Sequence, residues 1–271
     1  MVISFFIDCK TRTSNDFLFV RINVSNFIEL ENVNLYYSCL VYREMSIKSY
    51  VCKLMGLKPR PKTEDVHALK NVSLSIRPGD RVGLIGHNGA GKSTLLKTIA
   101  SLYPITSGTV SVQGEVRALF ELSLGFELEA TGRENILYRG LLLGKSPKEM
   151  KTLQDEIVAF ADLHEFIDYP IKTYSAGMMV RLAFAISTAV KGEILLLDEV
   201  IGAGDDNFMA KAKKRIHQLI DEAKIMVLTS HDLSAIRNLC NRAVVLNHGE
   251  IIFDGGVEEA IKVYKIEGDK Q

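Results

Sequence analysis

A glycine-rich run followed by a lysine and a serine has residue types and spacing suited to binding phosphate. It reads Gly86-His87-Asn88-Gly89-Ala90-Gly91-Lys92-Ser93 and fits the pattern G-x-x-x-x-G-K-[ST]. Glycines let a backbone fold closely around an anion, and free N–H groups at a helix N-terminus attract phosphate oxygens. The pattern predicts that Lys92 reaches the β- and γ-phosphates of a nucleotide and that the Ser93 hydroxyl binds Mg²⁺.

A pair of carboxylates follows a second apolar run. Residues 194–197 are all isoleucine or leucine and end at Asp198 and Glu199. A buried strand would deliver both side chains at its carboxyl end, where ligands bind in open α/β sheets. Alone, such a pair is more often structural. With a phosphate-binding loop upstream, we expect Asp198 to hold Mg²⁺, commonly through water, and Glu199 to polarise the water that attacks the γ-phosphate.

Strands and helices that could position these residues alternate along the chain. Val82 to Ile85 is typical of a buried strand, and apolar residues recur at helical spacing from Ser93 to Leu102. An accidental glycine-rich turn would need neither flank. Further expected strands cover residues 27–37 at the edge of a sheet, 71–76, a pair at 109–112 and 115–120, 193–197, 225–229, and a pair at 243–246 and 251–253. This alternation predicts a largely parallel sheet with antiparallel additions.

Capping signals mark where several helices begin. Thr131 and Glu134 predict a capping box for a helix that runs to about Leu143, Ser146-Pro147 predicts the start of the next helix, and Ser175 predicts a cap for a helix over 177–190. Other helices are expected over 209–223, shortly after His231, and over 257–266.

An insertion from residue 38 to about residue 66 separates two of the expected strands. Within it, apolar residues from Ile47 to Leu54 recur at helical spacing beside Lys48 and Lys53. This basic amphipathic helix could lie against a membrane surface or membrane partner, or it could cap the core of its own domain. Sequence alone favours neither interpretation. Residues 1–26 are uneven in pattern, and we treat them as an N-terminal extension.

Composition narrows the class of protein. The 271 residues contain 33 Lys+Arg and 33 Asp+Glu, so the net charge of zero gives no electrostatic argument for a nucleic-acid partner. The four cysteines have no metal-type spacing and indicate reduced thiols in a cytosolic protein. No window approaches the roughly 18 to 20 apolar residues of a membrane helix. A membrane role would therefore require a partner that spans.

Three further segments occur in a fixed order around the carboxylate pair. The segment before it reads Tyr174-Ser175-Ala176-Gly177-Met178, and those after it read Gly204-Asp205 and Thr229-Ser230-His231-Asp232. With the glycine-rich run, this ordered set resembles the ATP-binding-cassette (ABC) ATPases, where such segments are the signature motif, the D-loop and the switch-histidine segment. The resemblance covers about residues 27–253.

The resemblance implies an α/β fold of the P-loop NTPase type. The ABC-type nucleotide-binding domain would cover residues 27–256, with a mixed sheet core, an antiparallel β subdomain and a helical subdomain over about 121–190. Residues 257–271 would form a C-terminal helix and tail. The resemblance also implies a head-to-tail homodimer in which each ATP is held by the glycine-rich run of one subunit and by Ser175 and Gly177 of the other.

Roles for individual residues follow from the same resemblance. The implied nucleotide-binding residues are Gly86, His87, Asn88, Gly89, Ala90, Gly91, Lys92, Ser93, Thr94, Tyr37, Ser175, Gly177 and Asp205. The implied catalytic residues are Glu199, His231 and Lys92, and the implied Mg²⁺ ligands are Ser93 and Asp198. Tyr37 is expected to stack on adenine, with Tyr36 or His67 as alternatives. Glu121-Leu122 stands where the family usually carries a glutamine, which leaves that contact open.

Within the superfamily, the chain most resembles ATPase subunits of bacterial polysaccharide exporters, which move O-antigen, capsule or teichoic-acid chains. The motifs that carry this resemblance are Thr131-Gly132-Arg133-Glu134-Asn135-Ile136, the segment from Tyr174 to Ala185, and the segment from Asp198 to Asp205. It implies a transmembrane permease partner, a lipid-linked polysaccharide substrate handled through that permease, and a peripheral place on the cytoplasmic side of the cytoplasmic membrane. The rivals are an exporter of drugs or small molecules, a soluble cassette protein acting on DNA or ribosomes, and a nucleotide-gated interaction module.

Overall fold

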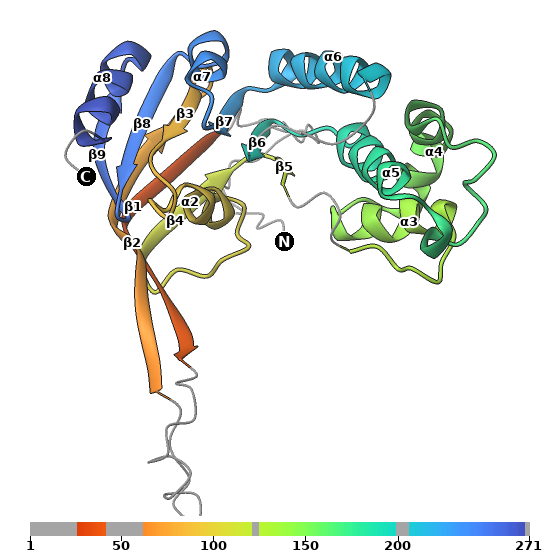
Figure 1. The fold of residues 1–271 in the computed structure, drawn as a ribbon, viewed down its shortest axis with the longest axis horizontal. Coiled ribbons are helices and arrows are strands. Elements are labelled where there is room, and N and C mark those ends of the chain that lie inside the picture. Colours follow the sequence, from red (N-terminus) through yellow and green to blue (C-terminus); the bar gives the residue numbers. More distant parts are fainter. Residues whose placement is uncertain (1–25, 42–61, 121–124, 199–205, 269–271) are drawn as a thin grey trace, which may run out of the picture.

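The computed structural model describes residues 26–41, 62–120, 125–198 and 206–268 (Figure 1). Its centre is a six-stranded sheet in the order β5-β6-β7-β3-β8-β9. The strands are β3 (Arg81–Ile85), β5 (Val116–Leu119), β6 (Ile194–Asp198), β7 (Ile225–Thr229), β8 (Arg242–Asn247) and β9 (Glu250–Gly255). All neighbours pair in parallel except β8 and β9. The prediction of a mixed, largely parallel sheet is confirmed.

Helices cover both faces of this sheet because its inner strands are apolar on both faces. On one face, Leu196 and Val227 pack against α2 (Lys92–Ile99) and against a second, smaller sheet. On the other face, Leu195 and Met226 share a core with α6 (Asp206–Glu222), α7 (Leu233–Leu239) and α8 (Val257–Gly268). α8 belongs to this core, since Ala260 and Ile261 are buried in it.

The smaller sheet is antiparallel, with the order β2-β1-β4 over β2 (Lys62–Ile76), β1 (Phe27–Val41) and β4 (Ser107–Gln113). The edge position expected for residues 27–37 is wrong, because β1 pairs on both sides. Alternating apolar residues report that one face of a strand is buried, and they carry no signal for how many of its edges are paired.

The expected pairing of residues 109–112 with 115–120 is also wrong. β4 pairs with β1, whereas β5 pairs with β6 in the central sheet. Between them Gly114 adopts a φ of 127°, a backbone conformation that favours glycine. β5 carries buried Arg117 and Leu119 and pairs inside the parallel sheet, so the chain passes from one sheet to the other at this point.

The ends of β1 and β2 extend the strands beyond the bounds expected for them. Residues 38–41 and 62–66 continue the β1–β2 ladder, which projects from the body as a two-stranded ribbon (Figure 1). The first and last residues of the insertion expected over residues 38 to about 66 are therefore part of these two strands. The amphipathic helix expected between Ile47 and Leu54 lies outside the described residues.

The helical subdomain has its own hydrophobic core. It contains α3 (Gly132–Leu142), α4 (Pro147–Ala161), α5 (Ala176–Ala189) and the short 3-10 helix η1 (Ile171–Thr173). Both capping boxes form, at Thr131 with Glu134 and at Ser146 with Glu149, and the Ser175 hydroxyl caps α5. These local signals confirm the expected helix starts.

Hydrogen bonds from a buried arginine to a backbone carbonyl connect the helical subdomain to the central sheet. Arg117 of β5 donates from both Nε and Nη2 to the Ser187 carbonyl in the last turn of α5. A positive charge there complements the helix dipole. Burial lowers the pKa of Arg117 to about 10, which still leaves the guanidinium charged at neutral pH.

α2 is shorter than the apolar spacing suggested. It ends at Ile99, and Leu102 is 57% exposed beyond it. Ser101, with a φ of 58°, turns the chain away. None of the helices in the described part of the chain is both long and apolar enough to cross a membrane.

Candidate nucleotide-binding site

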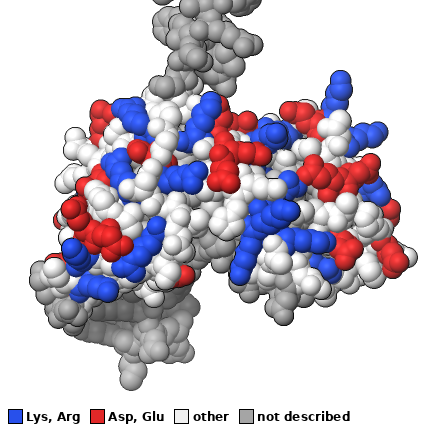
Figure 2. Space-filling view, turned by 90° about the horizontal axis from the view of Figure 1, so that it is seen from above, with Lys and Arg blue, Asp and Glu red and all other residues white. Residues whose placement is uncertain are grey.

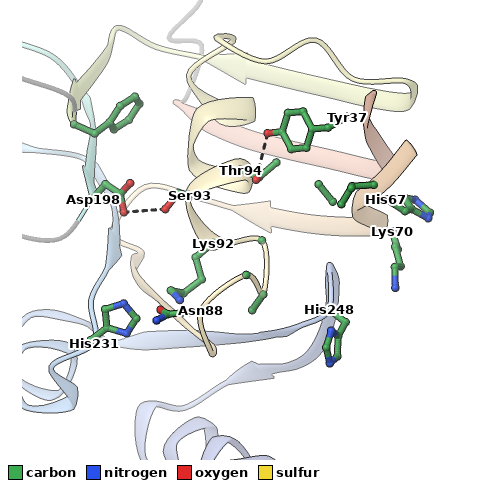
Figure 3. A pocket seen from close by; sticks show the side chains of 16 residues that line it. Tyr37, His67, Lys70, Asn88, Lys92, Ser93, Thr94, Asp198, His231 and His248 are labelled. Carbon is green, nitrogen blue, oxygen red and sulfur yellow. Dashed lines mark hydrogen bonds between the residues drawn. The ribbon is translucent and has the colours of Figure 1, made fainter. Parts of the chain in front are cut away.

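A cavity of about 670 Å³ opens where the glycine-rich loop meets the carboxyl ends of the central strands. Seven residues of the loop and of the first turn of α2, from Asn88 to Thr94, line it. Asp198 at the end of β6 and His231 after β7 line the same cavity, as do Tyr37 of β1 and residues of β2 (Figure 3). The structure thus gathers side chains predicted from four separate sequence segments.

Glycines in the loop are required by tight packing as well as by phosphate access. Gly91 caps α2 with a φ of 104°, and a Cβ there would lie 2.9 Å from the Ala68 carbonyl oxygen. At Gly86 a Cβ would lie 2.5 Å from the Leu246 carbonyl oxygen. Real Cβ atoms do not approach backbone oxygens this closely, so the loop is held by β2 on one side and by β8 on the other.

Lys92 is folded into the loop. Its side chain is largely buried, and Nζ donates to the carbonyl oxygens of Gly86 at 2.8 Å and His87 at 3.0 Å. These two residues do not line the cavity; their contribution is through the backbone. A cationic donor held here can exchange the carbonyls for the oxygens of a bound phosphate.

At the site expected to bind Mg²⁺, a hydroxyl oxygen and a carboxylate oxygen lie within hydrogen-bond distance of each other. The Ser93 hydroxyl donates to Asp198 Oδ1 at 3.3 Å, and the Thr229 hydroxyl donates to the same carboxylate oxygen. Mg²⁺ prefers hydroxyl and carboxylate oxygens and keeps several waters or phosphate oxygens as further ligands. The donor set at Ser93 and Asp198 therefore fits the ion, with Thr229 orienting the carboxylate.

Three aromatic side chains are candidates for stacking on the adenine base. Tyr37 lies against Tyr103 at a centroid distance of 5.6 Å, and its hydroxyl donates to Thr94 Oγ1 at 3.3 Å. Burial raises the pKa of Tyr37 above its usual value. Tyr36 and His67 stack with centroids 4.0 Å apart and an interplanar angle of 13°. Of the three residues, Tyr37 and His67 line the cavity.

The signature segment lies apart from the cavity. Ser175 and Gly177 are exposed at the N-terminus of α5 and are not among the lining residues. Among the described residues, a Cβ at Gly177 would meet only Ser175 Oγ, at 3.9 Å, so packing against them does not require a glycine there. Of the other expected site residues, Glu199 and Asp205 lie outside the described residues, as does Glu121.

Several lining residues were not anticipated from the sequence. Lys70 on β2 and His248 in the β8–β9 turn line the cavity, and Phe120 lines it after β5. His248 and Gly249 have φ values of 47° and 86°, typical of the tight hairpin turn that the sequence pattern indicated. The turn reaches the site because the Gly249 carbonyl accepts from Lys70 N at 2.8 Å, a long-range contact with no local signal.

Comparisons with known proteins agree with this geometry. Residues 69–202 match the family described as ABC transporter. The O-antigen export system ATP-binding protein RfbE of Yersinia enterocolitica is 48% identical over 192 residues, covering 71% of this chain and 80% of that protein. The teichoic acids export ATP-binding protein TagH of Lactococcus lactis is 41% identical over 220 residues, covering 81% of this chain; the chain spans only 47% of that longer relative.

A solved structure supports the same fold. The ATP-binding cassette MJ0796, described as dimeric in a post-hydrolysis state and bound to ADP and Pi, superposes with a TM-score of 0.62 at 23% identity, covering 85% of this chain and 98% of that one. The resemblance drawn from the ordered motifs is confirmed. This chain belongs to the ABC transporter family, as one of its ATP-binding proteins.

Proposed function

We propose that this protein binds ATP with Mg²⁺ and hydrolyses it to drive export of a polysaccharide. The contact of Ser93 with Asp198, beside Lys92 and His231 in one cavity, is the observation that carries the ATPase assignment. Lys92 would neutralise the transferred phosphate, and Ser93 with Asp198 would hold the metal. Glu199 follows Asp198 directly and would orient the attacking water, and His231 would contact the γ-phosphate. Mg²⁺ would supply charge neutralisation on the phosphate oxygens.

The second half of each site would come from another copy of the chain. Ser175 and Gly177 are exposed, and the absence of a side chain at Gly177 leaves open space at the start of α5. No packing contact among the described residues explains the choice of glycine in this first turn of α5. Close approach of a nucleotide held by a partner subunit explains it. We infer a head-to-tail homodimer, with Asp205 near the same interface.

Export of a polysaccharide is inferred from the relatives, several of which are named as export system proteins for O-antigen or teichoic acids. A membrane permease would then be required. α3 offers a surface for it, because Tyr138, Leu141 and Leu142 lie at helical spacing and are all exposed, Leu142 at 73%. An exposed apolar stripe of this kind marks an interaction site. The protein would thus sit peripherally on the cytoplasmic side of the membrane.

Charge distribution offers little support for the rival in which a soluble cassette acts on nucleic acid. Figure 2 shows lysine and arginine side chains interspersed with aspartate and glutamate, and no single sign covers the face in view. Binding to a phosphate backbone favours a continuous basic surface. Export of a drug or small molecule remains the second candidate.

Disruption of the gene in its source cell tests the substrate. We expect lipid-linked polysaccharide to accumulate in the cytosol and to disappear from the cell surface, and a plasmid copy of the wild-type gene to restore it. Complementation with a Lys92→Met copy is the matched control, and it should fail. Unchanged surface polysaccharide would refute the proposed cargo while leaving the ATPase assignment intact.

Substitutions at Tyr37 test which aromatic stacks on the base. Tyr37→Ala should raise KM for ATP about tenfold, because stacking of an aromatic on a base contributes roughly 1 to 3 kcal/mol. Tyr37→Phe keeps the ring and loses only the Thr94 hydrogen bond, so KM should stay near the wild-type value. His67→Ala is the comparison. If it raises KM while Tyr37→Ala does not, the base stacks on His67 instead.

A further inference from the structure

One side chain of the phosphate-binding loop faces away from the cavity. The His87 ring lies against Tyr264 of α8, with centroids 4.9 Å apart and an interplanar angle of 37°. Gly268, the last residue of α8, lies beside the ring edge, since a Cβ there would be 3.5 Å from His87 Cε1 and 3.7 Å from Nε2. The loop is therefore in direct contact with the final turns of α8.

This contact comes at the far end of a well-anchored helix. At its start, Glu258 forms a two-point ion pair with Arg237 of α7, at 2.7 and 3.2 Å. Ala260 and Ile261 in the next turn are buried at 0% and 2% exposure. Near its other end, Tyr264 is half-buried and rests on His87. α8 thus connects the body of the domain to the loop.

The backbone of His87 holds the lysine that would bind phosphate. Its carbonyl oxygen accepts from Lys92 Nζ at 3.0 Å and from Ala90 N at 3.1 Å. Whatever fixes the His87 side chain therefore also fixes the peptide that sets the shape of the loop. The ring itself is not held by a hydrogen bond from Nε2, which is buried and has no hydrogen-bond partner among the described residues. A buried polar atom without a partner favours release of the contact, so the packing of Tyr264 must hold it.

We propose that Tyr264 is a positioning residue for the phosphate-binding loop and that the last turns of α8 regulate nucleotide affinity through His87. The aromatic contact keeps the loop in its binding shape before the nucleotide arrives, which lowers the ordering cost of binding. Displacement of these turns frees the ring, loosens the loop and weakens binding. The inference rests on the proposed function, because it assumes that the loop binds nucleotide phosphates.

Calorimetric titration of the full chain with MgADP tests the proposal, since this probe engages the loop and is not hydrolysed. Tyr264→Leu should raise the Kd for MgADP about 3- to 10-fold, the range expected for loss of one aromatic pair. In ATPase assays the same variant should raise KM while kcat changes less than twofold. Tyr264→Phe keeps the ring and should restore wild-type values.

Two controls separate positioning from general destabilisation. Glu258→Gln breaks the ion pair at the start of α8 without touching the loop, so it should lower the melting temperature and leave the Kd unchanged. In a His87→Leu background, Tyr264→Leu should add no further loss. An equal loss in both backgrounds, or a wild-type Kd for Tyr264→Leu, would overturn the proposal. Failure of the wild-type chain to bind MgADP would instead refute the proposed function.

Discussion

Lys92→Met should lower kcat/KM for ATP hydrolysis by about 10²- to 10³-fold, the range seen when one donor to a developing anionic charge is removed. Methionine keeps the aliphatic stem that packs in the loop and removes the charge. The change removes the hydrogen bonds that Nζ donates to the carbonyls of Gly86 and His87, and the His87 carbonyl keeps a second donor in Ala90 N. The fold should therefore survive the change.

A second lysine of the same helix provides the control for charge alone. Lys97 lies five residues further along α2, with Nζ 5.3 Å from the Tyr103 ring centroid, and it does not line the cavity. Lys97→Met removes the contact of Nζ with the ring and hydroxyl of Tyr103 and should keep kcat/KM within about twofold. Steady-state ATPase rates with melting temperatures measure both variants. Equal losses in the two would show that the loop lysine has no special role.

Glu199→Gln should lower kcat by about 10²- to 10⁴-fold, because it removes the proposed general base and keeps the shape of the side chain. Binding should be spared, since the Mg²⁺ ligands Ser93 and Asp198 and the donor Lys92 remain. The Kd for MgATP should stay within about threefold of the wild-type value. A homodimer that forms on ATP and opens on hydrolysis should then accumulate, visible by light scattering.

Glu193, at the other end of the same strand segment, is the matched control. Its carboxylate accepts from Lys224 Nζ and from Asn26 Nδ2, which lowers its pKa. Glu193→Gln weakens these surface contacts and should reduce stability slightly without changing kcat. If Glu199→Gln hydrolyses ATP as fast as the wild type, Glu199 is not the base. A large loss without ATP-dependent dimers would keep the base and refute the homodimer.

Features set by neighbours in sequence were predictable. The loop, its flanking strand and helix, and the caps at Thr131, Ser146 and Ser175 all depend on residues within a few positions of one another. In each cap, the side chain accepts a hydrogen bond from the backbone N–H three residues later. Both partners therefore lie within one short stretch of sequence. The ordered motifs then identified the family, which the relatives confirm.

Pairing between distant strands was not predictable in the same way. The central place of β1 and the separation of β4 from β5 depend on which strand edges meet, and an alternating pattern reports only which face is buried. Lys70 and His248 were not predicted as site residues for the same reason. They line the cavity because β2 contacts the β8–β9 turn, which is far from it in sequence.

The amino-acid sequence by itself determined the chemistry of this protein, since residue types and local spacing define a phosphate loop and a carboxylate pair. Only the tertiary structure decided what surrounds them. It joined Ser93 to Asp198 across 105 residues, left Ser175 and Gly177 exposed on another subdomain, and placed the His87 ring against Tyr264. These relations arise from packing between elements far apart in the chain. Hydrophobic burial drives such packing and is non-directional, so the spacing of apolar residues marks which face is buried and not which distant element covers it.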